Sequence, residues 1–320
     1  MKQWEDIYEI GLPLPFALKE IKVYLIKGST GYTIIDAGLH TDDSISTWKR
    51  AQEVYHWNWD EVEKIVLTHY HPDHYGLAGS IQQWTQAPVY ISQTDQEQAK
   101  LFLDPESDMP ELMSSFFRKH GLAESLVAEI PNHLRSFHSW VEPHPTSTFI
   151  QGGDSIQLGD RTYQIFHTPG HADGHLSFFD PERGWLIGGD FLLPRITPNI
   201  SLWPGCNDNP LETYLLTLEK MKELPVQRVF PSHGSVFDHY HERIDQIREH
   251  HEIRLGKMKE MVEQSDGLTA FDVCQKLFGT ELSIHNLRFA LSETLAHLEY
   301  LKSKDAINVV GSELIRYVGR

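Results

Sequence analysis

The 320-residue sequence predicts an α/β protein that is followed by a small helical domain. Up to about residue 240, short apolar runs typical of buried strands alternate with segments whose apolar residues have helical spacing. After that point the helical spacing dominates, and two short apolar runs at the end read as a hairpin. We therefore expect one domain over residues 1–240 and a second over residues 241–320.

The composition predicts a protein with a hydrophobic core and an acidic surface. Hydrophobic residues make up 40% of the chain, and the net charge is -17 at pH 7, which disfavours binding to nucleic acid or anionic membrane. The two cysteines are not paired at metal-ligand spacing. The first residues lack the basic and apolar pattern of a signal peptide, and no apolar run approaches the ~18 residues of a membrane span. We expect a cytoplasmic protein.

The elements of the first domain follow from these patterns. Helices are predicted from Ser44 to His56, from Gly76 to Trp84 and from Pro210 to Lys222. A further helical pattern, from Thr94 to about Leu134, defines an insertion over about residues 94–146, which forms either a wall of the substrate site or a purely structural helical pair. The predicted strands are residues 23–26, 32–35, 65–67, 89–91, 154–158, 162–166, 176–179, 185–187 and 228–230.

Three helices and a hairpin are predicted for the second domain, an order that looks like a winged-helix module. The helices are residues 244–262, 268–278, with Thr269 as a candidate N-cap, and 284–298, and the hairpin strands are 307–310 and 314–318. Residues 243–320 hold 11 basic and 12 acidic residues, so their net charge is 11 − 12 = −1. A nucleic-acid-binding domain needs a basic stripe. We therefore expect this domain to be structural, to dimerise the chain or to form a wall of the pocket.

The densest group of potential metal ligands is the segment Thr68-His69-Tyr70-His71-Pro72-Asp73-His74, directly after an apolar run. Imidazoles at i and i+2, followed by a carboxylate and an imidazole at i+4 and i+5, can face two adjacent points in space. One loop can then contribute ligands to two metal ions. Neutral imidazole and carboxylate suit zinc, and also iron or manganese.

Three later predicted strands also end in residues of ligand type. The strand over 162–166 leads to His167 and His171, the strand over 185–187 leads to Asp190, and the strand over 228–230 leads to His233. A sheet that delivers imidazole and carboxylate groups from several strand ends builds a site on one edge. We expect that edge to carry the metal site.

These motifs resemble those of the metallo-β-lactamase superfamily of hydrolases, including its glyoxalase II-like branch. The resemblance covers about residues 20–240 and implies an αββα sandwich with an added C-terminal winged-helix-like domain. It rests on Ile35-Asp36-Ala37-Gly38, Thr68 to Gly76, Thr168-Pro169-Gly170-His171, Gly188-Gly189-Asp190 and Pro231-Ser232-His233-Gly234.

The resemblance implies a complete dinuclear site. One metal ion is bound by His69, His71 and His171, the other by Asp73, His74 and His233, and Asp190 bridges the pair. The two divalent ions are expected to be Zn²⁺, with Mn²⁺ or Fe²⁺ as alternatives. Asp36 and His175 are expected to support the ligands or to lie near the substrate, as is Tyr70.

The implied chemistry is hydrolysis by a hydroxide that bridges the two metals and attacks an electrophilic carbonyl. Asp73 is the predicted catalytic residue, because it can orient the nucleophile or shuttle its proton while it binds metal. The expected partner is a small-molecule thioester, ester or lactone. No supported catalytic triad is present, and a homodimer is compatible with the composition.

Two other functions stay open from the sequence. The first is a metal-dependent endoribonuclease, which the acidic charge disfavours. The second is a mononuclear iron dioxygenase that acts on persulfides, and the presence of both His74 and His233 argues against it. The remaining histidines are many, and we expect eight of them to be surface residues without a special role: His120, His133, His138, His144, His239, His241, His250 and His251.

Overall fold

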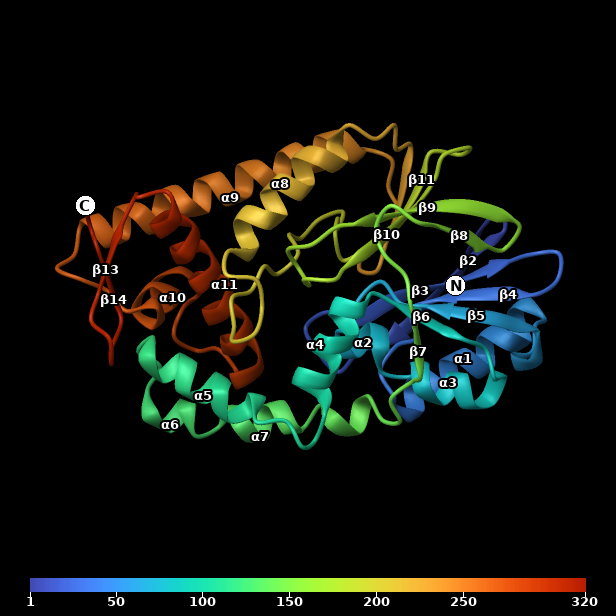
Figure 1. The fold of residues 1–320 in the computed structure, drawn as a ribbon, viewed down its shortest axis with the longest axis horizontal. Coiled ribbons are helices and arrows are strands. Elements are labelled where there is room, and N and C mark those ends of the chain that lie inside the picture. The colour runs from blue at the N-terminus through green and yellow to red at the C-terminus, as the bar shows by residue number, and fades with distance from the viewer. The chain divides into compact units, whose positions relative to one another are not determined.

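The computed structural model describes residues 1–320, which group into two compact units. The first unit comprises residues 1–103, 137–198 and 224–243, and the second comprises residues 104–136, 199–223 and 244–320. The first unit contains two β-sheets, and the second is mainly helical (Figure 1).

The first sheet has seven strands in sequence order. Strands β1 to β4 pair antiparallel, whereas β4 to β7 pair parallel. Three of its strands, β1, β2 and β7, are absent from the sequence prediction. Two of these have only three residues, and β2 includes a glycine and a proline that obscure its alternation. The strands are β1 (Lys2–Trp4), β2 (Ile7–Pro13), β3 (Glu20–Lys27), β4 (Tyr32–Ile35), β5 (Val62–Val66), β6 (Val89–Ile91) and β7 (Ser147–Phe149).

The second sheet has five strands in the order β12-β11-β10-β9-β8. All neighbours pair antiparallel except β11 and β12, which are parallel. Strands β9, β11 and β12 therefore run in the same direction, and their carboxyl ends lie at one edge. The strands are β8 (Ser155–Leu158), β9 (Arg161–His167), β10 (Leu176–Asp180), β11 (Trp185–Gly189) and β12 (Arg228–Pro231), which matches the five predicted strands of this region.

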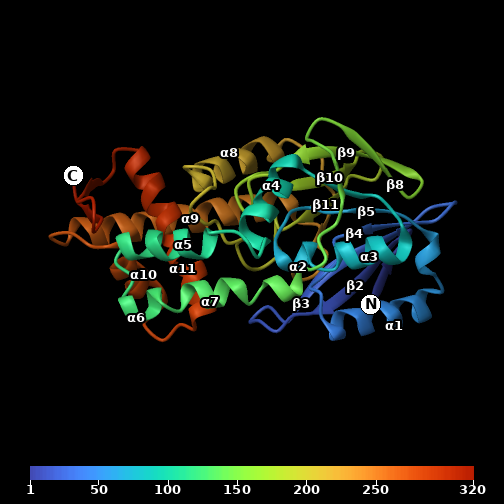
Figure 2. The same ribbon diagram turned by 60° about the horizontal axis from the view of Figure 1, so that its bottom comes forward.

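Helices α1 (Asp42–Tyr55) and α3 (Ala78–Thr85) cover one face of the first sheet (Figures 1 and 2). Helix α1 begins where the Thr41 side chain accepts a hydrogen bond from the Ser44 amide, 3.2 Å away. On its buried face, Trp48 Nε1 donates to the Ala37 carbonyl at 3.0 Å. The first unit also contains α2 (Pro72–Tyr75), α4 (Gln93–Leu103) and the 3₁₀ turns η1 (Trp59–Glu61) and η2 (His138–Trp140).

Two hydrophobic cores hold the first unit together. The core between the helices and the first sheet includes Trp48, Ile65 and Ile81, all fully buried. The core between the two sheets includes Ile35 from the first sheet and Phe178 and Phe230 from the second. Burial on both faces explains why the central strands read as continuous apolar runs in the sequence.

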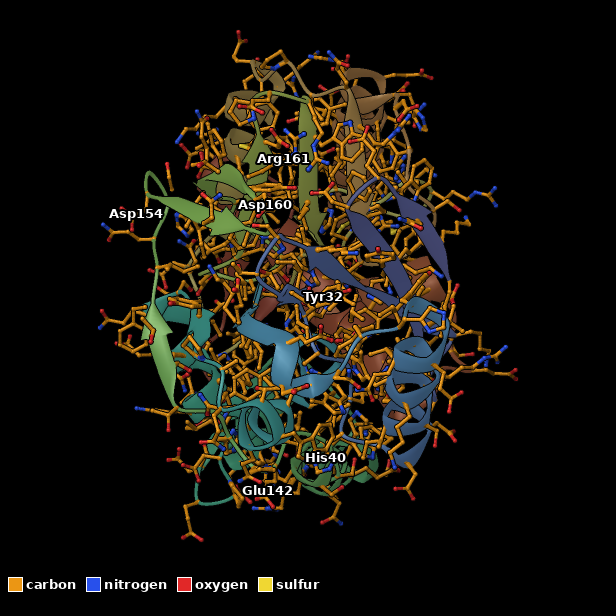
Figure 3. All side chains as sticks on the ribbon, turned by 90° about the vertical axis from the view of Figure 1, so that its right-hand side faces the viewer. Tyr32, His40, Glu142, Asp154, Asp160 and Arg161 are labelled. Carbon is orange, nitrogen blue, oxygen red and sulfur yellow. The ribbon has the colours of Figure 1, made fainter.

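The two sheets are also joined where the turn between β3 and β4 meets the turn between β8 and β9. The turn between β8 and β9 carries Asp160, whose Oδ1 accepts hydrogen bonds from the amide and hydroxyl of Ser29, each 2.8 Å away. Figure 3 looks at this end of the first unit and labels Asp160 and Arg161 beside Tyr32. At the far end of the same view, the His40 ring contacts the carbonyl oxygen of Glu142.

The second unit contains seven helices and a two-stranded hairpin. The predicted helical stretch between Thr94 and Leu134 is in fact four helices, and Pro105 and Gly121, with φ +93°, lie in two of the three breaks between them. Thr269 caps α10 as predicted, with its hydroxyl 3.1 Å from the Asp272 amide. The elements are α5 (Met109–Lys119), α6 (Glu124–Val127), α7 (Ile130–Arg135), α8 (Pro210–Lys222), α9 (Tyr240–Glu263), α10 (Ala270–Phe278), α11 (Ile284–Ser303), β13 (Asn308–Val310) and β14 (Arg316–Val318). None of the helices is both long and apolar enough to cross a membrane.

Two histidines that we expected at the surface are buried. His120 is only 7% exposed and faces the Tyr317 hydroxyl, and His251 is 0% exposed. His251 falls on the apolar face of α9, and its Nδ1 lies 3.0 Å from Nε2 of the equally buried His297. His297 Nδ1 donates to the Glu293 carbonyl at 2.7 Å, so its Nε2 accepts from His251.

This buried pair predicts acid sensitivity. Burial lowers the pKa of His251 to about 2 and of His297 to about 3, against ~6.5 in an unfolded chain. Below pH 6.5 these two histidines therefore bind protons in the unfolded chain but stay neutral in the folded chain, so the free energy of unfolding falls as the pH falls. Each histidine contributes about 1.4 kcal/mol per pH unit in that range.

Replacement of both residues by leucine removes this contribution. In urea unfolding of metal-free protein between pH 7 and 5.5, we expect the wild type to lose roughly 2 kcal/mol more than the double variant. Equal losses in the two proteins would show that the pair is not held neutral in the folded state.

Candidate metal centre

The structure brings all seven predicted ligands together at one edge of the first unit. Strands β5, β9, β11 and β12 end there, and the loops that follow them carry the ligand side chains. The side chains form three overlapping groups, in each of which the ligand atoms lie within 4.8 Å of one another: His69, His71 and His171; His69, His74 and Asp190; Asp73, His74 and His233.

The first group is a triangle of imidazole nitrogens. His69 Nε2 lies 3.0 Å from His71 Nδ1, which lies 2.9 Å from His171 Nε2. His69 is fully buried, whereas His71 and His171 are partly exposed. Three ring nitrogens that face one point are the arrangement that a metal ion requires.

The second group combines a carboxylate with two imidazoles. Asp73 Oδ2 lies 3.4 Å from His233 Nε2 and 3.9 Å from His74 Nε2. The Asp73 side chain is 20% exposed, so this group is open to solvent on the Asp73 side.

Asp190 lies between the two groups. Its Oδ2 is 3.3 Å from His171 Nε2 and 3.6 Å from His233 Nε2, and its Oδ1 is 3.7 Å from His74 Nε2. One carboxylate thus approaches imidazoles of both groups, which is the place of the predicted bridging ligand.

Asp36 directs the His74 ring. Its Oδ2 accepts from His74 Nδ1 at 2.8 Å, and its Oδ1 accepts from the Thr68 amide at 2.8 Å. Asp36 adopts φ +60°, a left-handed conformation that aspartate tolerates better than most residues. With Nδ1 protonated toward Asp36, Nε2 of His74 has its lone pair toward the site, as a metal ligand requires.

Two other ligand rings are fixed by groups outside the predicted site residues. His69 Nδ1 lies 3.0 Å from the Thr68 hydroxyl, which also contacts Asp36. His233 Nδ1 donates to the main-chain carbonyl of Glu20 at 3.1 Å. Thr68 stands directly before the ligand loop in the sequence, so its supporting role could have been predicted. Glu20 acts through its main-chain carbonyl, which every residue has, so the residue type could not reveal its role.

His175 is fully buried and supports Asp190 through the backbone. The Asp190 amide donates to His175 Nε2 at 3.1 Å, and the His175 Nδ1 proton is directed to the Thr168 hydroxyl at 2.8 Å. Gly189 makes this possible, because a Cβ there would lie 2.6 Å from His175 Nε2. His175 therefore holds the backbone of Asp190, which fits the prediction of a supporting role.

The remaining candidates lie as follows. Tyr70 is 4% exposed, and its ring packs on the ring of His71, with centroids 4.8 Å apart. Tyr70 is therefore a buried core residue next to a predicted metal ligand. His167 is exposed, and its Nε2 donates to the Asp173 carbonyl at 2.7 Å. His167 is thus outside the cluster.

The pKa values of the cluster follow the charges around each group. Burial alone would lower the pKa of His74 and His233, but Asp36 and Asp73 raise that of His74, and Asp190 raises that of His233. Burial alone would raise the pKa of Asp73, but the imidazoles of His74 and His233 lower it to about 2. Burial would likewise raise the pKa of Asp190, which His233 and His74 lower well below its usual value. Burial, together with the neighbouring imidazoles, lowers the pKa of His69 well below its usual value. Ionised carboxylates and a neutral imidazole are the forms that bind metal.

These residues fit divalent metal cations. His74 Nε2 and Asp190 Oδ1 are buried atoms without a hydrogen-bond partner, and they point toward each other across 3.7 Å. A buried carboxylate oxygen without a partner is costly. A cation in contact with both atoms would satisfy them, and the set of nitrogen and oxygen donors suits zinc, iron or manganese.

Comparison with known proteins identifies the family. Residues 20–233 match the family model described as the metallo-beta-lactamase superfamily, and residues 256–318 match the model of a metallo-beta-lactamase-like C-terminal domain. The chain belongs to the metallo-beta-lactamase superfamily.

Two of its relatives span nearly the whole chain, and a third spans about three quarters of it. A Bacillus subtilis protein named probable metallo-hydrolase is 30% identical over 95% of this chain and 94% of its own. An acyl-coenzyme A thioesterase of Gallus gallus is 28% identical over 73% of this chain and 76% of its own. The crystal structure of a metallo-beta-lactamase family protein from Thermus thermophilus has a TM-score of 0.87 at 28% identity, and the match covers 99% of both chains. The predicted α/β metallo-beta-lactamase fold is confirmed, and the chain is a metallo-hydrolase.

The role of Asp36 can be tested with Asp36→Asn, which keeps the size of the side chain. If the amide oxygen accepts from the Thr68 amide, its NH₂ group faces His74 Nδ1 and favours the His74 tautomer with Nε2 protonated. We expect metal affinity to fall about 10- to 100-fold, measured by competition with a chelator.

The control is Asp180→Asn, a buried carboxylate of the same unit that binds Arg183 and lies at the end of β10. It should lower stability and leave metal affinity unchanged. Unaltered metal affinity in Asp36→Asn would contradict the role given to Asp36.

Proposed function

We propose that the chain is a dinuclear metal-dependent hydrolase that cleaves a small acyl thioester. The observation that carries the proposal is the position of Asp190 between two complete ligand groups, within 3.3 Å of His171 and 3.6 Å of His233. A site for a single ion would have no need for the second group.

The first metal site would consist of His69, His71 and His171, and the second of Asp73, His74 and His233, with Asp190 common to both. Two bound cations would supply hydroxide at neutral pH by lowering the pKa of water from ~15.7 to about 7, and would stabilise negative charge on the carbonyl oxygen. The metal we expect is zinc, with manganese or iron as alternatives.

Asp73 is the residue suited to handle the proton of the attacking water. It is ionised at neutral pH, since its pKa is lowered to about 2, and its side chain is partly exposed. Its carboxylate can accept a hydrogen bond from the water, orient the lone pair toward the carbonyl carbon and release the proton to solvent.

The same pKa argues for a leaving group that needs no proton. A carboxyl with a pKa of about 2 carries no proton at neutral pH, so it cannot act as a general acid toward the leaving group. A thiol has a pKa near ~8.5 and leaves as thiolate, whereas an alkoxide or amine must be protonated as it leaves. Water adds to the carbonyl, the C–S bond breaks, and a carboxylate and a thiol are released.

The names of relatives support this choice of substrate. The Gallus gallus relative is named for the hydrolysis of an acyl-coenzyme A thioester. An RNA substrate is disfavoured by the net charge of −17, since binding to a phosphate backbone depends on lysine and arginine.

The proposal predicts that Asp73→Ala abolishes turnover and leaves the fold intact. Loss of the proton acceptor and of one metal ligand should lower kcat by at least about 10²- to 10⁴-fold, with an unchanged far-UV circular dichroism spectrum. The matched control is Asp154→Ala, an exposed carboxylate in the turn before β8 (Figure 3), which should retain full activity. Retained turnover in Asp73→Ala would refute the assignment.

The substrate class is tested with a panel of S-acylglutathione and acyl-coenzyme A thioesters, homoserine lactones, nitrocefin and single-stranded RNA, on zinc- and manganese-loaded protein. We expect the thioesters to be hydrolysed fastest. RNA cleavage without thioester turnover would reverse the proposal.

A further inference from the structure

Asp95 is a buried carboxylate that touches none of the proposed ligands directly. It is 0% exposed, lies in the first turn of α4, and forms no ion pair. Burial raises its pKa to about 7, although two backbone N–H donors lower it. A buried carboxylate without a cation is expensive, so its position calls for a reason.

The two donors come from the two loops that carry the ligands of the first metal site. Asp95 Oδ2 accepts from the Tyr70 amide at 3.1 Å, and Oδ1 accepts from the Gly174 amide at 2.7 Å. Tyr70 lies between the ligands His69 and His71, and Gly174 lies in the loop after His171.

The two loops run side by side, and Asp95 completes their pairing. The Leu176 amide donates to the Thr68 carbonyl at 2.8 Å, which ties the loops together at one end. Tyr70 lies two residues after Thr68, and Gly174 lies two residues before Leu176. The backbone amides of both residues require a hydrogen-bond acceptor. The carboxylate of Asp95 supplies one oxygen to each and so acts as the second tie.

The surroundings of Asp95 are shaped for this contact. The Asp95 amide donates to the Ser92 hydroxyl at 3.1 Å, which fixes the start of α4. Residue 174 must be glycine, because a Cβ there would lie 2.6 Å from Asp95 Oδ1. Asparagine at position 95 cannot substitute, since its NH₂ group would face one of the two backbone N–H donors.

We propose that Asp95 is a positioning residue that holds the His69–His71 turn against the loop after His171 and thereby sets the affinity of the first metal site. The three nitrogens of that site come from these two loops, so a change in the spacing of the loops changes the triangle. The second site draws on Asp73, His74 and His233. Asp36 fixes the His74 ring, and the Glu20 carbonyl fixes the His233 ring. The proposal rests on the two metal sites proposed above and does not depend on the substrate.

The test measures zinc affinity in two single-site backgrounds. His233→Ala removes a ligand of the second site, and His171→Ala removes a ligand of the first. We expect Asp95→Asn to weaken zinc binding about 10- to 100-fold in the His233→Ala chain and to leave it within a few-fold in the His171→Ala chain. A general folding defect would weaken both chains equally, and that result would overturn the proposal.

Two further measurements keep the proposal open to refutation if Asp95→Asn folds poorly. Ser92→Ala removes only the hydroxyl that anchors Asp95 and should show the same selectivity with a smaller loss. In the metal-free wild-type background, Asp95→Asn or Ser92→Ala should reduce the hydrogen-exchange protection of the Tyr70 and Gly174 amides. Unchanged protection would contradict the tie, whatever the enzyme hydrolyses.

The control for both measurements is Asp180→Asn, which also places an amide at a buried carboxylate position of the first unit. It should leave zinc affinity unchanged in both single-site chains. Failure of the parent chains to bind zinc would count against the proposed ligand set, whereas the amide protection would still decide the role of Asp95.

Discussion

The structure depends on the close approach of unprotonated ring nitrogens at one edge of two sheets. His71 Nδ1 lies 3.0 Å from His69 Nε2 and 2.9 Å from His171 Nε2, and the three nitrogens surround one point. Lone pairs at such distances repel one another, and burial prevents protonation from relieving the repulsion, because it lowers the pKa of His69 and His71. A cation is the group that makes this arrangement favourable, and much of the surrounding hydrogen bonding serves to keep the nitrogens in place.

That support comes from main-chain and buried polar groups rather than from the ligands themselves. Asp36 fixes the tautomer of His74, the Glu20 carbonyl fixes the ring of His233, and His175 fixes the backbone of Asp190. Each partner lies at or next to a strand end of the two sheets. The sheets are rigid because both faces of their central strands are buried, so the geometry of the site follows from the packing of the two cores.

Much of the site could be predicted from sequence, because only a few residue types have side chains that bind metal ions, and apolar runs locate the strand ends that carry them. Asp36 and His175 were also expected in supporting roles. Glu20 was not found, because it acts through its carbonyl, and the contacts of Asp95 depend on loops that are distant in sequence. The burial of His251 was missed because its partner His297 lies on another helix. The winged-helix likeness of the C-terminal domain, the homodimer and the domain boundaries stay predictions.

The central claim is that one chain holds two metal ions that share Asp190. Zinc titration of metal-free protein, followed by isothermal calorimetry and elemental analysis, tests it most directly. We expect two ions per wild-type chain, one in His171→Ala and one in His233→Ala. One ion or none in the fully reconstituted wild type would show that the chain does not hold a dinuclear site.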